Sequence, residues 1–212
     1  MKIGLLFDLD GTLLDTLGDL RNSVNFALAT FGYPQRTLAE IRSFVGTGAR
    51  NLSRLSMPAG KDNVDEVLAA FQAHYKDHCN IETGPYAGIL AALEALKDIP
   101  MAIVSNKPDY AVKELAATYF PGIYALGEVA GTPRKPAPDM LYKAMKDIGV
   151  EKCIYIGDSE VDIKTAHGAG LPCLSVTWGF RDETVLLEAG ATHICRNVAD
   201  MSAALTQMMN EL

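Results

Sequence analysis

Apolar and polar positions along the chain form two alternating kinds of segment. The first kind is a short, continuous apolar run containing β-branched residues, which is typical of a strand buried on both faces of a parallel sheet. The second kind is a longer stretch in which apolar residues recur at helical spacing. We expect strands at 2–7, 99–104, 152–157, 171–176 and 192–195, a weaker strand at 122–127, and helices at 88–97, 109–119, 137–148, 160–169, 183–189 and 199–210. This alternation predicts an α/β fold with a parallel sheet that is covered by helices on both faces.

One region interrupts the alternation. Between Asp15 and about Gly84 no segment looks like a strand, and helical patterns are separated by turn signals such as Gly32-Tyr33-Pro34. We expect helices there at 17–31, 38–45, 49–56 and 62–79. The sequence therefore predicts a helical domain at 16–82, inserted into an α/β domain formed by 1–15 and 83–212.

Composition narrows the classes of protein that the chain can represent. Its 212 residues suffice for one domain, or for a domain with a smaller insert. No apolar run is long enough for a membrane helix, and the start does not resemble a signal peptide, so we expect a cytoplasmic protein. The formal net charge of −7 argues against a nucleic-acid binder. Widely spaced cysteines without CxxC pairs indicate reduced thiols in the core: Cys79, Cys153, Cys173 and Cys195.

Polar residues follow three of the expected strands. Asp8 and Asp10 follow the first, Ser105-Asn106-Lys107 follows the strand at 99–104, and Asp158 follows the strand at 152–157. Asp162 lies one helical turn after Asp158. Because the carboxyl ends of parallel strands share one edge, these residues should converge. Carboxylates crowded in one crevice repel each other unless a divalent cation lies among them, and oxygen-only ligands suit Mg²⁺. The acidic turn is therefore predicted to be a metal site.

A lysine is expected to join the same edge. The segment "RKPAPDM" (134–140) places Lys135 just before a helix whose first turn accepts proline. A lysine, a serine hydroxyl, backbone N–H groups and Mg²⁺ together form a receptor for a phosphoryl group. We therefore predict a site for phosphoryl chemistry.

Four segments, taken in order, resemble the four motifs of the haloacid dehalogenase superfamily. They are "DLDGT" (8–12), "VSN" (104–106), "RKP" (134–136) and "GDSEVD" (157–162), and they cover the expected sheet from end to end. The resemblance implies a Rossmann-like parallel sheet with a small helical-bundle cap inserted after the first strand. It also implies a Mg²⁺-dependent hydrolase, and the second aspartate, Asp10, favours phosphoryl chemistry over dehalogenation.

The resemblance further implies a role for each motif residue. Asp8 would attack phosphorus to give an aspartyl-phosphate, and Asp10 would protonate the leaving alcohol and then activate water. Ser105 would hold phosphate oxygens, and Lys135 would stabilise charge on the nucleophile and the phosphoryl group. Backbone amides near Gly11 and Asn106 would assist, with Thr12 beside them. The implied metal ligands are Asp8, the Asp10 carbonyl and Asp158, with Asp162 either a ligand or a support for one.

Within that superfamily, several details resemble phosphoglycolate phosphatases. They include "FVGTGARNL" (44–52), "SNKP" (105–108), "KPAPDM" (135–140) and "WGFR" (178–181). The backbone at Gly46 and Gly48 could approach a small carboxylate, with Arg50 close by. The resemblance thus implies a phosphatase for a small phosphorylated metabolite, monomeric or homodimeric, with no nucleic-acid or membrane partner.

Several alternatives stay open at this point. A β-phosphoglucomutase-like mutase places histidine where Leu20 stands, a phosphonate-cleaving enzyme needs a cap lysine that is missing between Lys2 and Lys61, and a pyrophosphatase uses the same fold. A non-catalytic binding module would also keep the fold. Taken singly, the acidic residues could be turn or helix-start residues. His74 and His78 have metal-pair spacing but lack a third ligand, so we interpret them as packed or solvated, and no role is assigned to Arg181.

Overall fold

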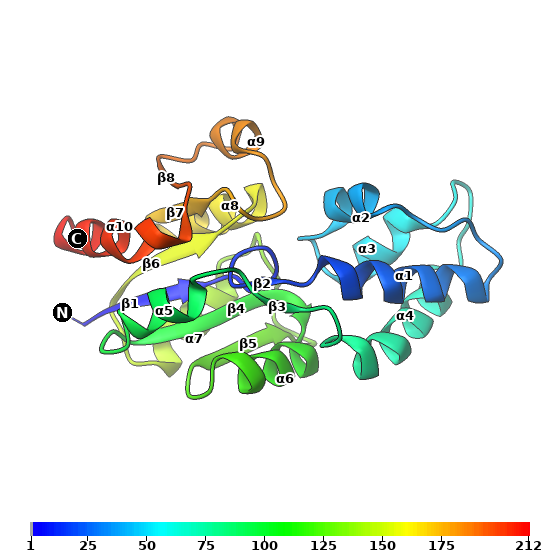
Figure 1. The fold of residues 1–212 in the computed structure, drawn as a ribbon, viewed down its shortest axis with the longest axis horizontal. Coiled ribbons are helices and arrows are strands. Elements are labelled where there is room, and N and C mark those ends of the chain that lie inside the picture. Colours follow the sequence, from blue (N-terminus) through cyan, green and yellow to red (C-terminus); the bar gives the residue numbers. More distant parts are fainter. Residues whose placement is uncertain (1) are drawn as a thin grey trace.

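A six-stranded parallel sheet forms the centre of the larger part of the protein. The computed structural model describes residues 2–212, and neighbouring strands follow the order β5-β4-β1-β6-β7-β8 (Figure 1). Every neighbouring pair in this sheet runs parallel. The strands are β1 (Ile3–Phe7), β4 (Met101–Pro108), β5 (Tyr124–Glu128), β6 (Lys152–Gly157), β7 (Cys173–Val176) and β8 (His193–Cys195). The predicted α/β fold is confirmed.

Helices cover both faces of the sheet, as the continuous apolar strands require. Successive side chains of a strand point to opposite faces. Leu5 and Phe7 of β1 accordingly pack on one face and Leu6 packs on the other. The first face is covered by α5 (Ile89–Glu94), α6 (Asp109–Tyr119) and α10 (Val198–Asn210), and the second by α7 (Asp139–Asp147), α8 (Glu160–Ala169) and α9 (Glu183–Glu188). The protein therefore has two hydrophobic layers that share one sheet.

A separate group of helices lies beyond the carboxyl ends of the strands, at the right in Figure 1. It has its own buried hydrophobic cluster, which includes Leu28, Ile41 and Phe71. Two short antiparallel strands, β2 (Leu14–Asp15) and β3 (Gly84–Pro85), lie where the chain leaves the sheet and returns to it. The helices are α1 (Leu17–Thr30), α2 (Leu38–Phe44), α3 (Ala49–Ser56) and α4 (Val64–His78). We refer to this group as the cap.

A buried carboxylate ties the two connections to the cap together. Asp19, in the first turn of α1, is 1% exposed. It accepts hydrogen bonds from the backbone N–H groups of Ile81, Glu82 and Thr83, and from the Thr83 hydroxyl at 2.7 Å. Hydrogen bonds to a charged acceptor are among the stronger ones. The outgoing helix α1 is therefore fixed to the segment just before β3, where the chain returns to the sheet.

The structure differs from the prediction at the end of β4. The apolar run predicts a strand that ends at 104, but β4 continues to Pro108 because β5 pairs with it again, after a shift in register, at Glu128. Ser105, Asn106 and Lys107 are therefore strand residues, held by the sheet. The two-residue strands β2 and β3 are too short for a pattern of their own and were not predicted.

Two smaller observations complete the fold. The four cysteines are buried, and no disulfide joins them within residues 2–212. In the described part of the chain, none of the helices has the length and apolar content needed to cross a bilayer.

Candidate active site

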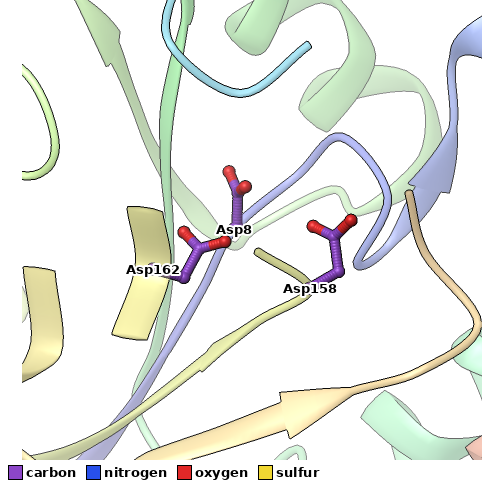
Figure 2. A group of neighbouring side chains, drawn as sticks. All are labelled: Asp8, Asp158 and Asp162. Atoms are coloured by element: carbon purple, nitrogen blue, oxygen red, sulfur yellow. The ribbon is translucent and has the colours of Figure 1, made fainter. Parts of the chain in front are cut away.

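Three buried aspartates meet at the carboxyl edge of the sheet. Figure 2 shows Asp8 following β1, Asp158 following β6 and Asp162 on α8, and one oxygen of each lies within 4.8 Å of the others. Burial, opposed by the Lys135 charge and reinforced by Asp162, raises the pKa of Asp8 to about 7. Burial, then the charges of Asp162 and Asp8, raises the pKa of Asp158 well above its ordinary value. The surroundings of Asp8 and Asp158 therefore supply too little positive charge to offset the effect of burial on these two carboxylates.

The donor set suits a hard divalent cation. Hard cations take oxygen ligands, and carboxylates are their usual protein ligands. Asp158 receives two hydrogen bonds, from the Phe180 backbone N–H at 2.7 Å and the Thr12 hydroxyl at 3.3 Å. Both donors are neutral, so neither cancels the charge of Asp158. A cation between Asp8 and Asp158 would supply the missing charge.

Asp162 is the most fully engaged of the three. Its Oδ1 accepts hydrogen bonds from Lys135 Nζ at 2.8 Å and from the Tyr155 hydroxyl at 2.9 Å. Its Oδ2 accepts hydrogen bonds from the backbone N–H and hydroxyl of Ser159, which completes the capping box of α8. With both oxygens occupied, Asp162 is placed to support Lys135 and the start of α8.

Lys135 is the cation nearest the three aspartates. Its side chain is 1% exposed, and Nζ lies 2.9 Å from Asp8 Oδ1 and 2.8 Å from Asp162 Oδ1. The Tyr155 hydroxyl is a third partner at 2.8 Å. Burial acts to lower the pKa of Lys135, but Asp162 and Asp8 outweigh it and hold that pKa above its ordinary value. Lys135 therefore stays charged and compensates part of the acidic cluster.

The two oxygens of Asp8 have unequal surroundings. Oδ1 accepts the Leu9 backbone N–H at 2.7 Å in addition to Lys135. Oδ2 accepts no hydrogen bond from any of residues 2–212. Asp8 therefore has one oxygen that is fixed in place and one that is open to a ligand.

Asp10 has a different environment from Asp8. Its Oδ1 accepts the Thr16 hydroxyl and Lys107 Nζ, both at 2.7 Å. Lys107 lies on β4, and its ammonium group lies over the ring of Tyr75 from the cap, 4.8 Å from the centroid. The two aspartates of this turn therefore pair with different lysines. Asp8 pairs with Lys135 and Asp10 pairs with Lys107.

A cavity of about 40 Å³ lies between the sheet edge and the cap. The residues that the sequence predicts for the site and that line the cavity are Asp8, Asp10, Gly46, Gly48, Ser105, Asn106 and Asp158. The structure brings most of the predicted site together, with cap and sheet residues on opposite walls.

Other predicted residues have a supporting place. The Gly11 N–H is used by the Leu14 carbonyl at 2.9 Å, and a Cβ on Gly11 would collide with Asp158. The Thr12 hydroxyl faces Asp158. The Asn106 side chain donates to the carbonyl oxygens of Gly46 and Lys135 and accepts from the Lys135 N–H. These residues shape the site, and Asn106 connects three segments.

Arg50 is not brought to the cavity. Its guanidinium pairs with Asp65 of α4, and the two side chains are 51% and 72% exposed. Arg50 lies in the first turn of α3, and the helix carries it away from Gly46 and Gly48. The sequence placed it near them in the chain, but the fold separates them.

Arg181 joins the sheet domain to the cap. It donates to the carbonyl oxygens of Arg42 and Val45 at the end of α2, and its Nε pairs with Glu160 at 2.9 Å. Arg42 donates in return to the Gly179 carbonyl and pairs with Asp182. The unassigned Arg181 is therefore a link that holds the cap against the loop after β7.

Sequence reasoning missed Lys107, Tyr75 and Tyr155. Lys107 carried one signal, a basic residue at the carboxyl end of a buried strand, but no role was given to it. Tyr75 and Tyr155 lie in apolar patterns that predict only core packing. Their proximity to the acidic groups depends on long-range contacts.

A family model described as haloacid dehalogenase-like hydrolase matches residues 5–176. Phosphoglycolate phosphatase of Rhodobacter capsulatus is 37% identical over 192 residues, which cover 85% of this chain and 87% of that protein. Phosphoglycolate phosphatase 1 of Pseudomonas aeruginosa is 32% identical over 211 residues, which cover 93% of this chain and 77% of that protein.

Solved structures agree with this likeness. A protein of Lactobacillus delbrueckii subsp. bulgaricus superposes with a TM-score of 0.89 and 36% identity, covering 95% of this chain and 97% of that chain. The crystal structure of CbbY from Rhodobacter sphaeroides, in complex with phosphate, superposes with a TM-score of 0.77 and 23% identity, covering 97% of this chain and 100% of that chain. The second likeness concerns the fold alone.

Proposed function

Because the chain belongs to the haloacid dehalogenase-like hydrolases and is a phosphatase, we propose that it hydrolyses a small, phosphoglycolate-like phosphomonoester through an aspartyl-phosphate, with Mg²⁺. One observation carries the proposal. Asp8 offers an unengaged oxygen to a cavity that Asp10 and Ser105 also line, while Lys135 holds its other oxygen. Convergence of a nucleophile, an acid–base group and a fixed charge is what phosphoryl transfer requires.

In the first step, Asp8 Oδ2 attacks phosphorus and forms a P–O bond as the ester P–O bond breaks. Asp10 gives its proton to the departing alkoxide, which leaves as an alcohol. Ser105, buried at the end of β4, is positioned to donate its hydroxyl to a phosphoryl oxygen. Lys135 holds Asp8 Oδ1 and places positive charge where negative charge accumulates.

In the second step, Asp10 takes a proton from a water molecule, whose oxygen attacks phosphorus. The bond from phosphorus to Asp8 breaks, so the Asp8 carboxylate is regenerated and inorganic phosphate leaves. The Asp10 carboxylate is held by Thr16 and Lys107, which fixes its direction in both steps. Closure of the cap over the cavity would exclude bulk water.

A divalent ion bound by Asp8, the Asp10 carbonyl and Asp158 would supply further positive charge for the phosphoryl group. Asp162 would support this set through Lys135 and Ser159. We also propose that 16–82 act as the cap domain over a core of 1–15 and 83–212, and that the enzyme works in the cytoplasm as a monomer or homodimer.

Metal removal tests the cofactor part of this proposal. Chelation should abolish phosphate release, and Mg²⁺ should restore it. At pH 8 and a hundredfold excess over Kd, Mg²⁺ should stabilise the folded protein by about 2.7 kcal/mol, which raises the thermal midpoint by about 5–10 °C. At pH 5 the shift should be smaller, because Asp8, with a pKa of about 7, then holds a proton instead. Differential scanning calorimetry with and without Mg²⁺ measures both, and equal shifts at the two pH values would contradict the metal site.

Side-by-side assays test the substrate class. We expect the highest kcat/KM for 2-phosphoglycolate among 2-phosphoglycolate, pyrophosphate, hexose phosphates and nucleotides, because the curated relatives that the chain resembles are named phosphoglycolate phosphatases. Conversion of β-glucose 1-phosphate to glucose 6-phosphate without phosphate release would instead indicate a mutase. Absence of turnover with every ester would contradict the proposed function.

Replacing Arg50 with Ala should change kcat/KM for 2-phosphoglycolate by no more than about twofold. The guanidinium pairs with Asp65 on an exposed surface, and such ion pairs contribute little. Steady-state assays of the variant and the wild-type protein measure this. A fall in kcat/KM of tenfold or more would show that Arg50 reaches the substrate when the cap moves.

A further inference from the structure

A second polar group lines the cavity beside Asp10. It consists of Lys107, from β4 of the sheet, and Tyr75, from α4 of the cap. Both residues line the cavity, and they meet where the Lys107 ammonium group lies over the Tyr75 ring. Cap and core therefore each contribute one polar side chain to the same corner.

Lys107 is buried with unused hydrogen-bond donors. Its side chain is 2% exposed, and its ammonium group has three N–H donors. Among residues 2–212, the only acceptor that receives a hydrogen bond from Nζ is Asp10 Oδ1, at 2.7 Å. Burying donors without acceptors costs free energy. The remaining donors of Lys107 would be satisfied by an acceptor in the cavity.

Tyr75 has an orphaned hydroxyl. The residue is fully buried, and its hydroxyl has no hydrogen-bond partner within the described chain. The ring stacks on Phe71 at a centroid distance of 5.2 Å, so its place in the cap is fixed. A phenylalanine would pack in the same way without the cost of an unpaired hydroxyl. The hydroxyl is therefore a second donor without an acceptor in the same corner.

The other side chains that the cap presents to the cavity are apolar. They are Leu20, Val45, Ala49, Leu52 and Phe71, and Phe180 lines the cavity from the loop after β7. These apolar side chains cannot form hydrogen bonds with the hydroxyl groups of a sugar or a nucleoside. They do strengthen the attraction between an ammonium group and an anion, because the local dielectric constant is low.

We propose that Lys107 and Tyr75 bind the carboxylate of a substrate in which that carboxylate is attached to the carbon bearing the phosphate ester. The inference deepens the proposed function and rests on it. Asp10 must lie near the ester oxygen to protonate it, and Lys107 Nζ lies 2.7 Å from Asp10. A carboxylate one carbon from that oxygen falls within reach of the same ammonium group. Lys107 and Tyr75 thus determine specificity for small phosphorylated hydroxy acids.

A pair of isosteric esters isolates this contact. 2-Phosphoglycolate and its amide, 2-phosphoglycolamide, differ in charge and hardly in shape. In the wild-type protein we expect kcat/KM for the carboxylate to exceed that for the amide by about a hundredfold, because hydrogen bonds between two charged groups are the strong ones. A ratio below about threefold would overturn the inference.

Lys107→Met should reduce this ratio to within about threefold of unity. If the substitution also disturbs Asp10, kcat falls for both esters alike, so this effect cancels in the ratio of the two kcat/KM values. Lys113→Met, on the exposed side of α6, is the matched control and should keep the wild-type ratio. A ratio in Lys107→Met equal to that of the wild-type protein would overturn the inference.

Tyr75→Phe provides a second test that does not depend on the folding of the lysine variant. It should raise KM for 2-phosphoglycolate about tenfold and leave thermal stability unchanged or higher, since it removes an unpaired hydroxyl. Tyr142→Phe, at an exposed position of α7, is its control. If Tyr75 were only a packing residue, KM would not move, and that outcome would contradict its role.

Failure of this inference can be distinguished from failure of the proposed function. Phosphate release from either ester upholds the phosphatase, whatever the ratio. If neither ester is hydrolysed, isothermal titration of both esters into Asp8→Asn and into Asp8→Asn/Lys107→Met measures the subsite directly. Tighter binding of the carboxylate that is lost with Lys107 supports the inference, and equal binding of the two esters overturns it.

Discussion

Replacing Asp8 with Asn is expected to lower kcat for phosphate release by about 10⁴-fold or more, the scale seen when a nucleophile is removed. The amide retains an oxygen for the Leu9 N–H but lacks the charged oxygen that attacks phosphorus. Single-turnover assays with 2-phosphoglycolate at saturating Mg²⁺ measure the effect. An unchanged rate would mean that another group attacks phosphorus.

Stability measurements show whether the Asp8→Asn variant is still folded. The pKa of Asp8 is raised on folding to about 7, so in the metal-free protein its protonation contributes stability below pH 4, and this contribution is lost as the pH rises to 7. An amide carries no charge at any pH. The metal-free variant should therefore be at least as stable as the wild-type protein at pH 8, and its advantage should disappear near pH 4. Urea denaturation at both pH values measures this difference, and a less stable variant at pH 8 would mean that the Asp8 charge is already compensated.

Most of the fold was predictable because its signals are local. The strands are continuous apolar runs that end in polar residues, and the helices repeat at their own period. The structure confirms the α/β fold, and β1, β6 and β8 lie within the predicted segments. The predicted end of β4 was wrong because pairing with β5, which is a long-range contact, extends the strand to Pro108. Sequence periodicity carries no information about such a contact.

The candidate site was predictable where several motifs point to one sheet edge. Asp8, Asp10 and Asp158 follow strands and Ser105 lies in the second half of β4, so topology alone brings them together. Arg50 was predicted to lie at the site because it is only two residues from Gly48 in the sequence. In the structure α3 directs its side chain to Asp65 instead. Tyr75 was missed because its helical spacing is that of a core residue, and only the docking of the cap on the sheet brings it over Lys107.

Replacing Lys135 with Met is expected to destabilise the metal-free protein at pH 8 by about 3–5 kcal/mol, which lowers the thermal midpoint by about 10 °C. Lys135 is the buried cation shared by Asp8 and Asp162, and its loss leaves their charges uncompensated. Its pKa is raised on folding, so its contribution is fully present at pH 8. We also expect kcat to fall by about 10³-fold, because no fixed charge would then stabilise the transferring phosphoryl group.

If Lys135 stabilises the protein through its charge, the loss of stability in Lys135→Met should depend on pH. If Lys135 acts only through packing, that loss should be independent of pH. Asp8, whose pKa is raised to about 7, holds a proton at pH 5, so the destabilisation by Lys135→Met should be smaller at pH 5 than at pH 8. Lys143→Met, the same change at an exposed α7 position paired with Asp147, should cost less than about 0.5 kcal/mol at either pH. Calorimetry of both variants at pH 5 and pH 8 separates the two accounts. A loss of stability in Lys135→Met that is the same at both pH values would assign Lys135 a packing role and would leave the acidic cluster without its proposed counter-charge.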